Sequence, residues 1–427
     1  MKERIAIVAG IRTPFCKAGG VMREMQADDL GAYIVAQLMA KTEIPSTSID
    51  EVIFGNVLQP SRSLNISRII AIKAGLPNQV TAFTVNRNCA SGLEAITTGS
   101  DKILLGQDEI VIAGGTESMS HFPMEVNQGF KNFLQRMGKS KSFMQKLSTA
   151  FSFRPSFLVP EIPEIGDPLC GLTMGQTAEV LAREFKIDRQ EQDRFALASQ
   201  NRTEKAIAEG RFNHEIEPIP LGPKYTSVQQ QDEGPRAGQT LDALSKLKPA
   251  FDPLTGTATA GNSSQITDGA AAVLLMKESK AKQLGLKPLG YILDYATAAL
   301  QPNRMGLGPA FAISKVLKKT GLQLSDIDLF EINEAFAVQV LAVLKACESD
   351  AFAKKELGRE KAVGVISQDK LNVNGGAIAL GHPLGASGTR LVITLLNELR
   401  RRNKNRGIAS LCIGGGQGQA VVLEVES

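Results

Sequence analysis

VNRNCASGLEA, residues 85–95, is the stretch around which the fold is expected to form. Residues 81–85, which lead into it, are β-branched or aromatic apart from one alanine, and this predicts a buried strand. Cys89 follows three polar residues, and the apolar residues after it begin a helical period. We therefore expect Cys89 at a sharp strand-to-helix turn, where the helix N-terminus should lower the pKa of its thiol. The alternative is a small, buried, inert cysteine.

Composition places the chain among ordinary globular proteins. It has 427 residues, of which 43% are hydrophobic and 22% are charged, and its net charge of +4 does not argue for nucleic acid. No secretory signal or membrane-spanning apolar run is evident. The cysteines are widely spaced without a CxxC pair, which argues against a disulfide framework and predicts a cytoplasmic protein. They are Cys16, Cys89, Cys170, Cys347 and Cys412.

Strand and helix patterns alternate along the chain, which predicts an α/β fold with a buried sheet. In the first half, strands are expected at residues 5–10, 49–57, 81–85 and 109–113, and helices at 28–40 and 63–74. The same order of patterns returns at residues 290–295, 309–317, 325–337, 372–396 and 409–418. We interpret this as an internal duplication of one α/β unit of roughly 120–140 residues. Chance similarity of two α/β segments is the alternative.

The region between the halves differs in character, with many Pro, Gln and Ser residues. We predict an N-terminal core domain (1–121 plus 265–287), an inserted loop domain (122–264) and a C-terminal core domain (288–427). The segment GNSSQITDGAAA, residues 261–272, returns the chain to the core. Its small residues permit either close approach to a ligand or tight packing.

Three further places could carry chemistry. His382 lies in a Gly-rich loop that opens a helix, although a lone histidine can be structural. Cys412 ends an apolar strand and precedes three glycines, whose N–H groups could bind an oxyanion or simply form a tight turn. Asn333 follows a strand and could contact a ligand or cap a helix. If the halves pack as mates, Cys89 and His382 face one site. The short spacings of zinc motifs are absent, so no metal is expected.

Five motifs, NCASG, GNSSQITDGAA, NEAFA, GHPLGASG and CIGGGQG, together resemble the thiolase family. The resemblance covers essentially the whole chain. It implies a thiolase-like fold of duplicated α/β units in five layers, αβαβα, with an inserted loop domain. It also implies a homodimer or homotetramer, with coenzyme A as a co-substrate and no permanently bound cofactor.

By this resemblance, Cys89 is the nucleophile that becomes acylated, and His382 takes its proton. Cys412 protonates the departing acetyl-CoA enolate and later deprotonates the incoming CoA thiol. His382, with a water held by Asn333, forms one oxyanion hole. The N–H groups of Cys89 and Gly414 form the other.

The resemblance also implies contacts to the substrate. Ser264 is expected near the pantetheine, Arg236 near the nucleotide, and Met174 and Phe336 in the thioester pocket. Many short-chain thiolases have HMG where residues 173–175 are TMG. The missing histidine argues against strict acetoacetyl-CoA specificity.

The leading interpretation is a degradative 3-ketoacyl-CoA thiolase of fatty-acid β-oxidation. The alternative is a biosynthetic acetoacetyl-CoA thiolase. A decarboxylating ketoacyl synthase typically lacks the second thiol, so Cys412 argues against that class. A non-catalytic lipid carrier is a further alternative, against which the joint presence of Cys89, His382 and Cys412 argues.

One segment is unusual for the family. Between Glu125 and Glu161 there are six Lys or Arg residues, no acid, and six of the 18 Phe residues. Its spacing predicts a basic amphipathic helical hairpin. It resembles the extended loop of thiolase subunits of trifunctional β-oxidation complexes, although Asn333 departs from the HEAFA of that subgroup. We expect it to contact an anionic membrane or an acidic hydratase/dehydrogenase chain, or else to pack on its own core.

Overall fold

The computed structural model describes residues 3–123, 126–159 and 166–426. The chain divides into two compact units. The first comprises Met1–His121 and Asp167–Ser427, and the second comprises Phe122–Gly166. The predicted three-part division at 121/122, 264/265 and 287/288 stays a prediction.

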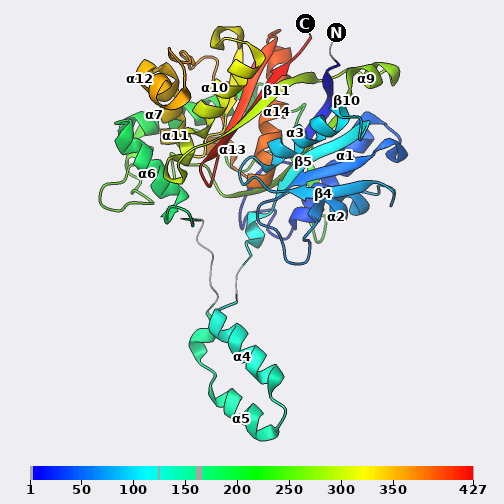
Figure 1. The fold of residues 1–427 in the computed structure, drawn as a ribbon, viewed down its shortest axis with the longest axis vertical. Helices are drawn as coiled ribbons and strands as arrows, with labels where there is room; N and C mark the ends of the chain where they lie inside the picture. The colour runs from blue at the N-terminus through cyan, green and yellow to red at the C-terminus, as the bar shows by residue number, and fades with distance from the viewer. Residues whose placement is uncertain (1–2, 124–125, 160–165, 427) are drawn as a thin grey trace. The chain divides into compact units, whose positions relative to one another are not determined.

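Within the described residues, ten strands form the main sheet of the first unit (Figure 1). Nine follow one another in the order β12-β13-β14-β11-β1-β10-β5-β3-β4, and β2 pairs with β10. Their bounds are β1 Ile5–Arg12, β2 Cys16–Lys17, β3 Glu51–Gly55, β4 Thr81–Val85, β5 Ile110–Glu117, β10 Thr267–Lys277, β11 Gly290–Ala299, β12 Leu329–Ile332, β13 Arg406–Ile413 and β14 Gln417–Glu424. A strand is therefore found at the expected residues 81–85, but the prediction that it is buried is wrong, because β4 lies at the edge of the sheet and its residues are partly exposed.

The sheet consists of two halves with the same topology. In the first half, β1 pairs antiparallel with β10, β10 antiparallel with β5, and β5 parallel with β3. In the second, β11, β14, β13 and β12 repeat these pairings in the same order. A parallel bridge from Phe330 to Leu371 occupies the place of the β3–β4 pairing. The predicted duplication is confirmed, and β1 joins β11 where the halves meet.

Helices cover both faces of each half-sheet. Between the halves, α3 (Ser91–Leu104) packs on α14 (Leu384–Arg401), and α14 contacts strands of both halves. On the outer faces, α1 (Ala27–Thr42) and α2 (Ile66–Lys73) cover one half, and α10 (Gly308–Thr320) and α11 (Ala337–Glu348) cover the other. Three apolar clusters fill the spaces between these layers. The arrangement is the expected αβαβα, and it has an α/β fold class.

Glycines allow the two central helices to approach closely. A Cβ atom added to Gly92 in α3 would lie 2.5 Å from the carbonyl oxygen of Gly385 in α14. A Cβ on Gly385 would lie 2.5 Å from the Thr116 carbonyl oxygen. Only glycine fits such contacts, so the ASG and GASG sequences bring the N-termini of α3 and α14 together. These N-termini carry the turns of Cys89 and His382.

The remaining elements of the first unit lie mainly between β5 and β10. They include β6 Gly166–Asp167, β7 Leu172–Thr173, α6 Met174–Glu184, α7 Arg189–Ala208, β8 Ile219–Pro220, β9 Val228–Gln229, α8 Leu241–Ser245, α9 Glu278–Gln283, α12 Asp350–Phe352 and α13 Ala377–Leu380. In the segment at 261–272, a Cβ on Gly261 would lie 2.5 Å from Leu247 Cδ1, so tight packing explains that glycine.

The second unit contains the two helices of the predicted hairpin, α4 (Gln128–Lys139) and α5 (Phe143–Phe151). Asn127 caps α4, and Ser142 with Gln145 forms a capping box at α5. No helix among the described residues is long and apolar enough to cross a membrane.

The aromatic residues of this hairpin form two groups. Phe130, Phe133, Phe153 and Phe157 stack on one another, with ring centroids 5.4 to 6.5 Å apart. The apolar residues of α5 lie exposed instead, including Phe143 at 77% and Phe151 at 83%. The predicted amphipathic hairpin thus has an aromatic cluster, in which Phe153 is still 37% exposed, and a separate exposed apolar face on α5.

Candidate active site

Cys89 occupies the predicted strand-to-helix turn. The chain leaves β4 and makes two successive turns, closed by bonds from the Ala90 N–H to the Arg87 carbonyl (3.1 Å) and from the Ser91 N–H to the Asn88 carbonyl (2.9 Å). Helix α3 then begins at Ser91. The side chain of Cys89 is half-buried.

The expected lowering of the Cys89 pKa is wrong. Burial raises the pKa of the thiol to about 11, because a thiolate loses its hydration there. The N–H groups of Gly414 and of Cys89 itself lower the pKa of the thiol, but their effect is smaller than that of burial. Cys89 therefore rests as a neutral thiol near pH 7.

His382 is positioned as a neutral base with a defined tautomer. The Ser387 hydroxyl donates to the Pro383 carbonyl at 2.9 Å, so its oxygen accepts from Nδ1–H of His382 at 2.6 Å. Nε2 of His382 then carries the lone pair, and it lies 3.3 Å from the Asn333 amide nitrogen. Burial, with a smaller effect of the Arg390 charge, lowers the His382 pKa to about 3.

Asn333 lies directly after β12 and is buried beside His382. Its backbone N–H donates to the Ser410 carbonyl of β13 at 2.9 Å, which fixes the turn. Its side-chain Oδ1 is buried without a protein partner, although buried amides normally have one. This fits the predicted role of holding a water, which stays a prediction.

Cys412 lies in β13 and is buried, and the turn at Gly414 joins it to Cys89. Burial raises the pKa of the Cys412 thiol, and the charge of a nearby Cys89 thiolate raises it further. The Asn88 amide donates to the Gly414 carbonyl oxygen at 2.9 Å. The structure thus brings Cys89, Cys412 and Gly414 together, and His382 lies in the loop just before α14, the helix that packs on α3.

The predicted substrate contacts are less closely grouped. Met174 begins α6, and its sulfur lies 3.4 Å from where a Cβ on Gly414 would stand. Phe336 precedes α11, next to Ser264, whose N–H donates to the Ala335 carbonyl at 2.9 Å. Arg236 is exposed, and no contact places it in the cluster of Cys89 and His382.

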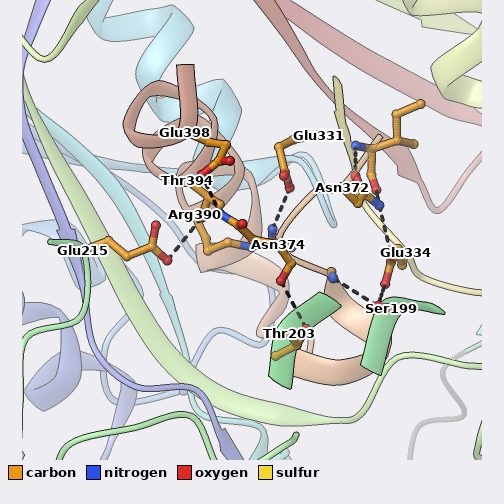
Figure 2. A network of polar contacts seen from close by, with 12 residues as sticks. Ser199, Thr203, Glu215, Glu331, Glu334, Asn372, Asn374, Arg390, Thr394 and Glu398 are labelled. Carbon is orange, nitrogen blue, oxygen red and sulfur yellow. Dashed lines mark hydrogen bonds and ion pairs between the residues drawn. The ribbon is translucent and has the colours of Figure 1, made fainter. Parts of the chain in front are cut away.

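A buried polar network includes Glu334, the residue directly after Asn333 in the chain (Figure 2). Glu334 accepts from Ser199 of α7 at 2.7 Å and from Asn372 at 2.8 Å. Arg390 of α14 pairs with Glu331 of β12 at 3.1 Å. These contacts join α7 and α14 to β12 and to the residue that follows Asn333.

Glu117 was not singled out from the sequence, although it ends β5 within a GGTES sequence at residues 114–118. Its carboxylate accepts from the N–H groups of Val57, Leu58 and Gly385 and from the Asn56 amide, at 2.9 to 3.1 Å. It thereby links the first half-sheet to the loop of His382. Burial raises the Glu117 pKa from 4.5 to about 7.

This pKa predicts a pH dependence of stability. Because the native pKa exceeds the unfolded value, the contribution of Glu117 is full below about pH 4.5 and is lost as the pH rises through about 7. Glu117→Gln should lower the free energy of unfolding, since its amide would face N–H donors. Urea titrations should also show a smaller decline in that free energy between about pH 5 and 7. The control is the exposed Glu109→Gln. Equal declines in Glu117→Gln and wild type would contradict the raised pKa.

The comparisons with known proteins agree with this geometry. Residues 5–279 match the family described as "Thiolase, N-terminal domain", and residues 286–425 match "Thiolase, C-terminal domain". The chain therefore belongs to the thiolase family.

Three similar proteins have names that describe an activity. The chain is 40% identical to the 3-ketoacyl-CoA thiolase of Aeromonas salmonicida (strain A449), over 99% of this chain and 97% of that protein. The Bacillus anthracis acetyl-CoA acetyltransferase superposes with a TM-score of 0.86 at 37% identity, covering 99% of both chains. Human mitochondrial 3-ketoacyl-CoA thiolase in complex with CoA gives a TM-score of 0.85 at 37% identity, covering 100% of this chain and 98% of that one.

Proposed function

We propose that this chain is an acyltransferase, a 3-ketoacyl-CoA thiolase that cleaves 3-ketoacyl-CoA with CoA through an acylated Cys89. The products are acetyl-CoA and a shortened acyl-CoA. One observation carries the proposal: the half-buried Cys89 thiol and the protonated Cys412 thiol lie close together beside Gly414, and the neutral His382 directly precedes α14, the helix that packs on α3. The names of the similar proteins support it.

In the first half-reaction, the Cys89 sulfur attacks the 3-keto carbon while Nε2 of His382 takes its proton. The pKa values of about 11 and about 3 disfavour a resting ion pair, so this proton moves as the C–S bond forms. The C2–C3 bond then breaks and leaves the enolate of acetyl-CoA. Cys412, whose raised pKa keeps it protonated, donates a proton to the enolate carbon.

In the second half-reaction, CoA replaces the enzyme as the acyl acceptor. The Cys412 thiolate takes the proton of the CoA thiol, whose sulfur attacks the acyl carbon bound to Cys89. The Cys89–acyl bond breaks, and the proton held by His382 returns to the sulfur. Negative charge develops on the acyl oxygen in both halves, which the N–H groups of Cys89 and Gly414 are placed to stabilise.

The finer assignments stay part of the proposal. Asn333 would hold a water that donates, together with protonated Nε2 of His382, to the thioester oxygen of acetyl-CoA. Ser264 and Arg236 would contact the pantetheine and nucleotide of CoA, and Met174 and Phe336 would line the thioester pocket. No permanently bound cofactor is proposed.

A series of 3-ketoacyl-CoAs of increasing chain length tests whether the enzyme is degradative or biosynthetic. We expect kcat/KM for thiolysis to be higher for substrates longer than acetoacetyl-CoA, because the TMG at residues 173–175 lacks the histidine of many short-chain enzymes. Steady-state cleavage is followed by loss of the 3-ketoacyl-CoA absorbance. Activity confined to acetoacetyl-CoA would favour the biosynthetic alternative, which the name of the Bacillus anthracis protein also fits.

The hairpin is proposed to contact an anionic membrane surface. In the structure, Phe143, Met144 and Phe151 of α5 are 71 to 83% exposed, next to the exposed Lys146. No acidic residue lies between 126 and 160, so the charge of this segment has one sign. Exposed aromatic rings beside cations are typical of interfacial helices.

Liposome binding tests this contact. Replacing Lys139, Lys141 and Lys146 with Glu should weaken binding to phosphatidylserine liposomes, since each basic residue contributes about 1 kcal/mol near an anionic surface. Cleavage of short, soluble substrates should be unchanged.

The matched control makes the same charge change in the first unit, at the exposed Lys224, Lys361 and Lys404. If wild type does not bind these liposomes at low salt, the membrane proposal is wrong. Co-purification with a hydratase/dehydrogenase chain instead would assign the same face to that partner.

A homodimer or homotetramer and a cytoplasmic location complete the proposal. Strand β4 ends the main sheet with a single neighbour, β3, and its residues are partly exposed. Such an edge offers unpaired backbone groups to a second copy. All five cysteines are free, which supports a reducing compartment.

A further inference from the structure

The peptide bond between Gly414 and Gly415 is held from both sides by side chains of two separate segments. The Asn88 amide donates to the Gly414 carbonyl oxygen at 2.9 Å. The Gly415 N–H donates to the Asp167 carboxylate at 2.9 Å. Because a peptide is planar, these two bonds together fix its rotation.

Each of the two side chains is itself well placed. Asn88 adopts a left-handed conformation with φ 45°, which asparagine tolerates better than most residues. Asp167 is buried in β6, which pairs with β7, and its second oxygen accepts from the Leu169 N–H at 2.8 Å. Asp167 is also where the chain returns to the first unit.

The turn that they hold needs such support. Gly415 and Gly416 have φ of 88° and 79°, and three successive glycines leave a backbone with little preference of its own. The Gly414 N–H is one of two backbone donors that favour a thiolate at Cys89, beside the N–H of Cys89 itself. It belongs to the preceding peptide, which shares the Gly414 Cα atom with the held one, so a displacement of Gly414 would move this donor away from the sulfur.

We propose that Asn88 and Asp167 are positioning residues that hold the Gly414 N–H toward the Cys89 sulfur and the oxygen of the acyl group bound there. The effect of these residues on turnover rests on the proposed thiolase function. Their effect on the reactivity of the Cys89 sulfur does not, because it can be measured in the free enzyme without substrate. Misplacement of a catalytic donor by ~1 Å can cost ~10²-fold in rate.

Paired variants separate this role from general stability. Asn88→Gly removes the amide but permits the left-handed conformation. Its control is Asn403→Gly, at an exposed asparagine with φ 52°. Asp167→Ala removes the acceptor, whereas Asp167→Asn retains one acceptor oxygen. The control Asp252→Ala removes a carboxylate that also accepts from N–H groups within its own turn.

Two measurements are made on each purified full-length variant. The first is the rate of Cys89 alkylation by iodoacetamide across a pH series, with the site identified by peptide mass. We expect Asn88→Gly and Asp167→Ala to lower this rate about 3- to 10-fold at each pH below the plateau, because the thiolate loses a donor. Asp167→Asn should restore part of it, and the controls should match wild type.

The second measurement is steady-state thiolysis. We expect kcat to fall ~10- to 100-fold, with the KM for CoA changed less than about 2-fold. The double variant should lose less than the product of the single losses, since both bonds hold one peptide. Wild-type alkylation profiles in Asn88→Gly and Asp167→Asn would overturn the proposal even if Asp167→Ala did not fold. Altered profiles in a protein without thiolase activity would overturn the proposed function alone.

Discussion

Cys89→Ala is expected to abolish thiolysis, with a fall in kcat of at least ~10⁴-fold. The reason is that the sulfur is the proposed covalent acceptor, and neither His382 nor Cys412 lies at the strand-to-helix turn that presents it. CoA binding should be nearly intact, because an alanine at this position removes one atom of a half-buried side chain. Activity is measured by 3-ketoacyl-CoA cleavage and binding by calorimetry.

Incubation of the wild-type enzyme with acetyl-CoA should add an acetyl mass to the peptide that contains Cys89. Cys347→Ala is the matched control, since Cys347 is a buried, free cysteine of α11 outside the cluster. Its variant should keep the acetyl label and most of the activity. An acetyl label on Cys412 would reverse the two assigned roles.

Cys412→Ser is expected to separate acylation from turnover. Acetyl-enzyme should still form on Cys89, while kcat for thiolysis should fall by the ~10²–10⁴-fold that is typical of a lost proton-transfer group. The serine hydroxyl is nearly isosteric, but it is a far weaker acid than the thiol. The loss therefore reports proton transfer more than packing. Rapid-quench labelling measures acylation, and steady-state assays measure turnover.

Cys16→Ser provides the control for that substitution, because Cys16 is likewise a buried strand cysteine, in β2. It should leave the rate of turnover near that of wild type. Near-normal turnover in Cys412→Ser would make Cys412 a packing residue and would remove the second acid/base from the mechanism.

Short-range patterns predicted most of the fold. The apolar residues at 81–85 and the small residues after Cys89 placed a strand, a turn and a helix that the structure has at those positions. The repeated order of patterns predicted two half-sheets of one topology, because each half must bury the same faces in the same sequence of layers. The five motifs then indicated the family.

The same patterns misjudged the electrostatics of the nucleophile. A helix N-terminus next to Cys89 suggested a lowered pKa, but the pKa is raised to about 11. Desolvation depends on all the atoms packed around the sulfur, most of which come from segments far away in sequence. The hairpin is a second case, since spacing did not distinguish Phe130 and Phe133, which are partly buried against other rings, from Phe143 and Phe151, which are exposed.

By itself, the sequence determined the duplicated α/β architecture and the residues that carry the proposed chemistry, because local periodicity and short motifs are enough to recognise both. Only the tertiary structure decided the pKa values, tautomers and hydrogen-bond partners of these residues. The tautomer of His382 follows from Ser387, and the link between half-sheets at Glu117 depends on strands far apart in the chain. The hydrogen bond from the Gly415 N–H to the Asp167 carboxylate joins residues that are 248 positions apart in the chain. Such contacts arise from burial and long-range packing, which no local pattern contains.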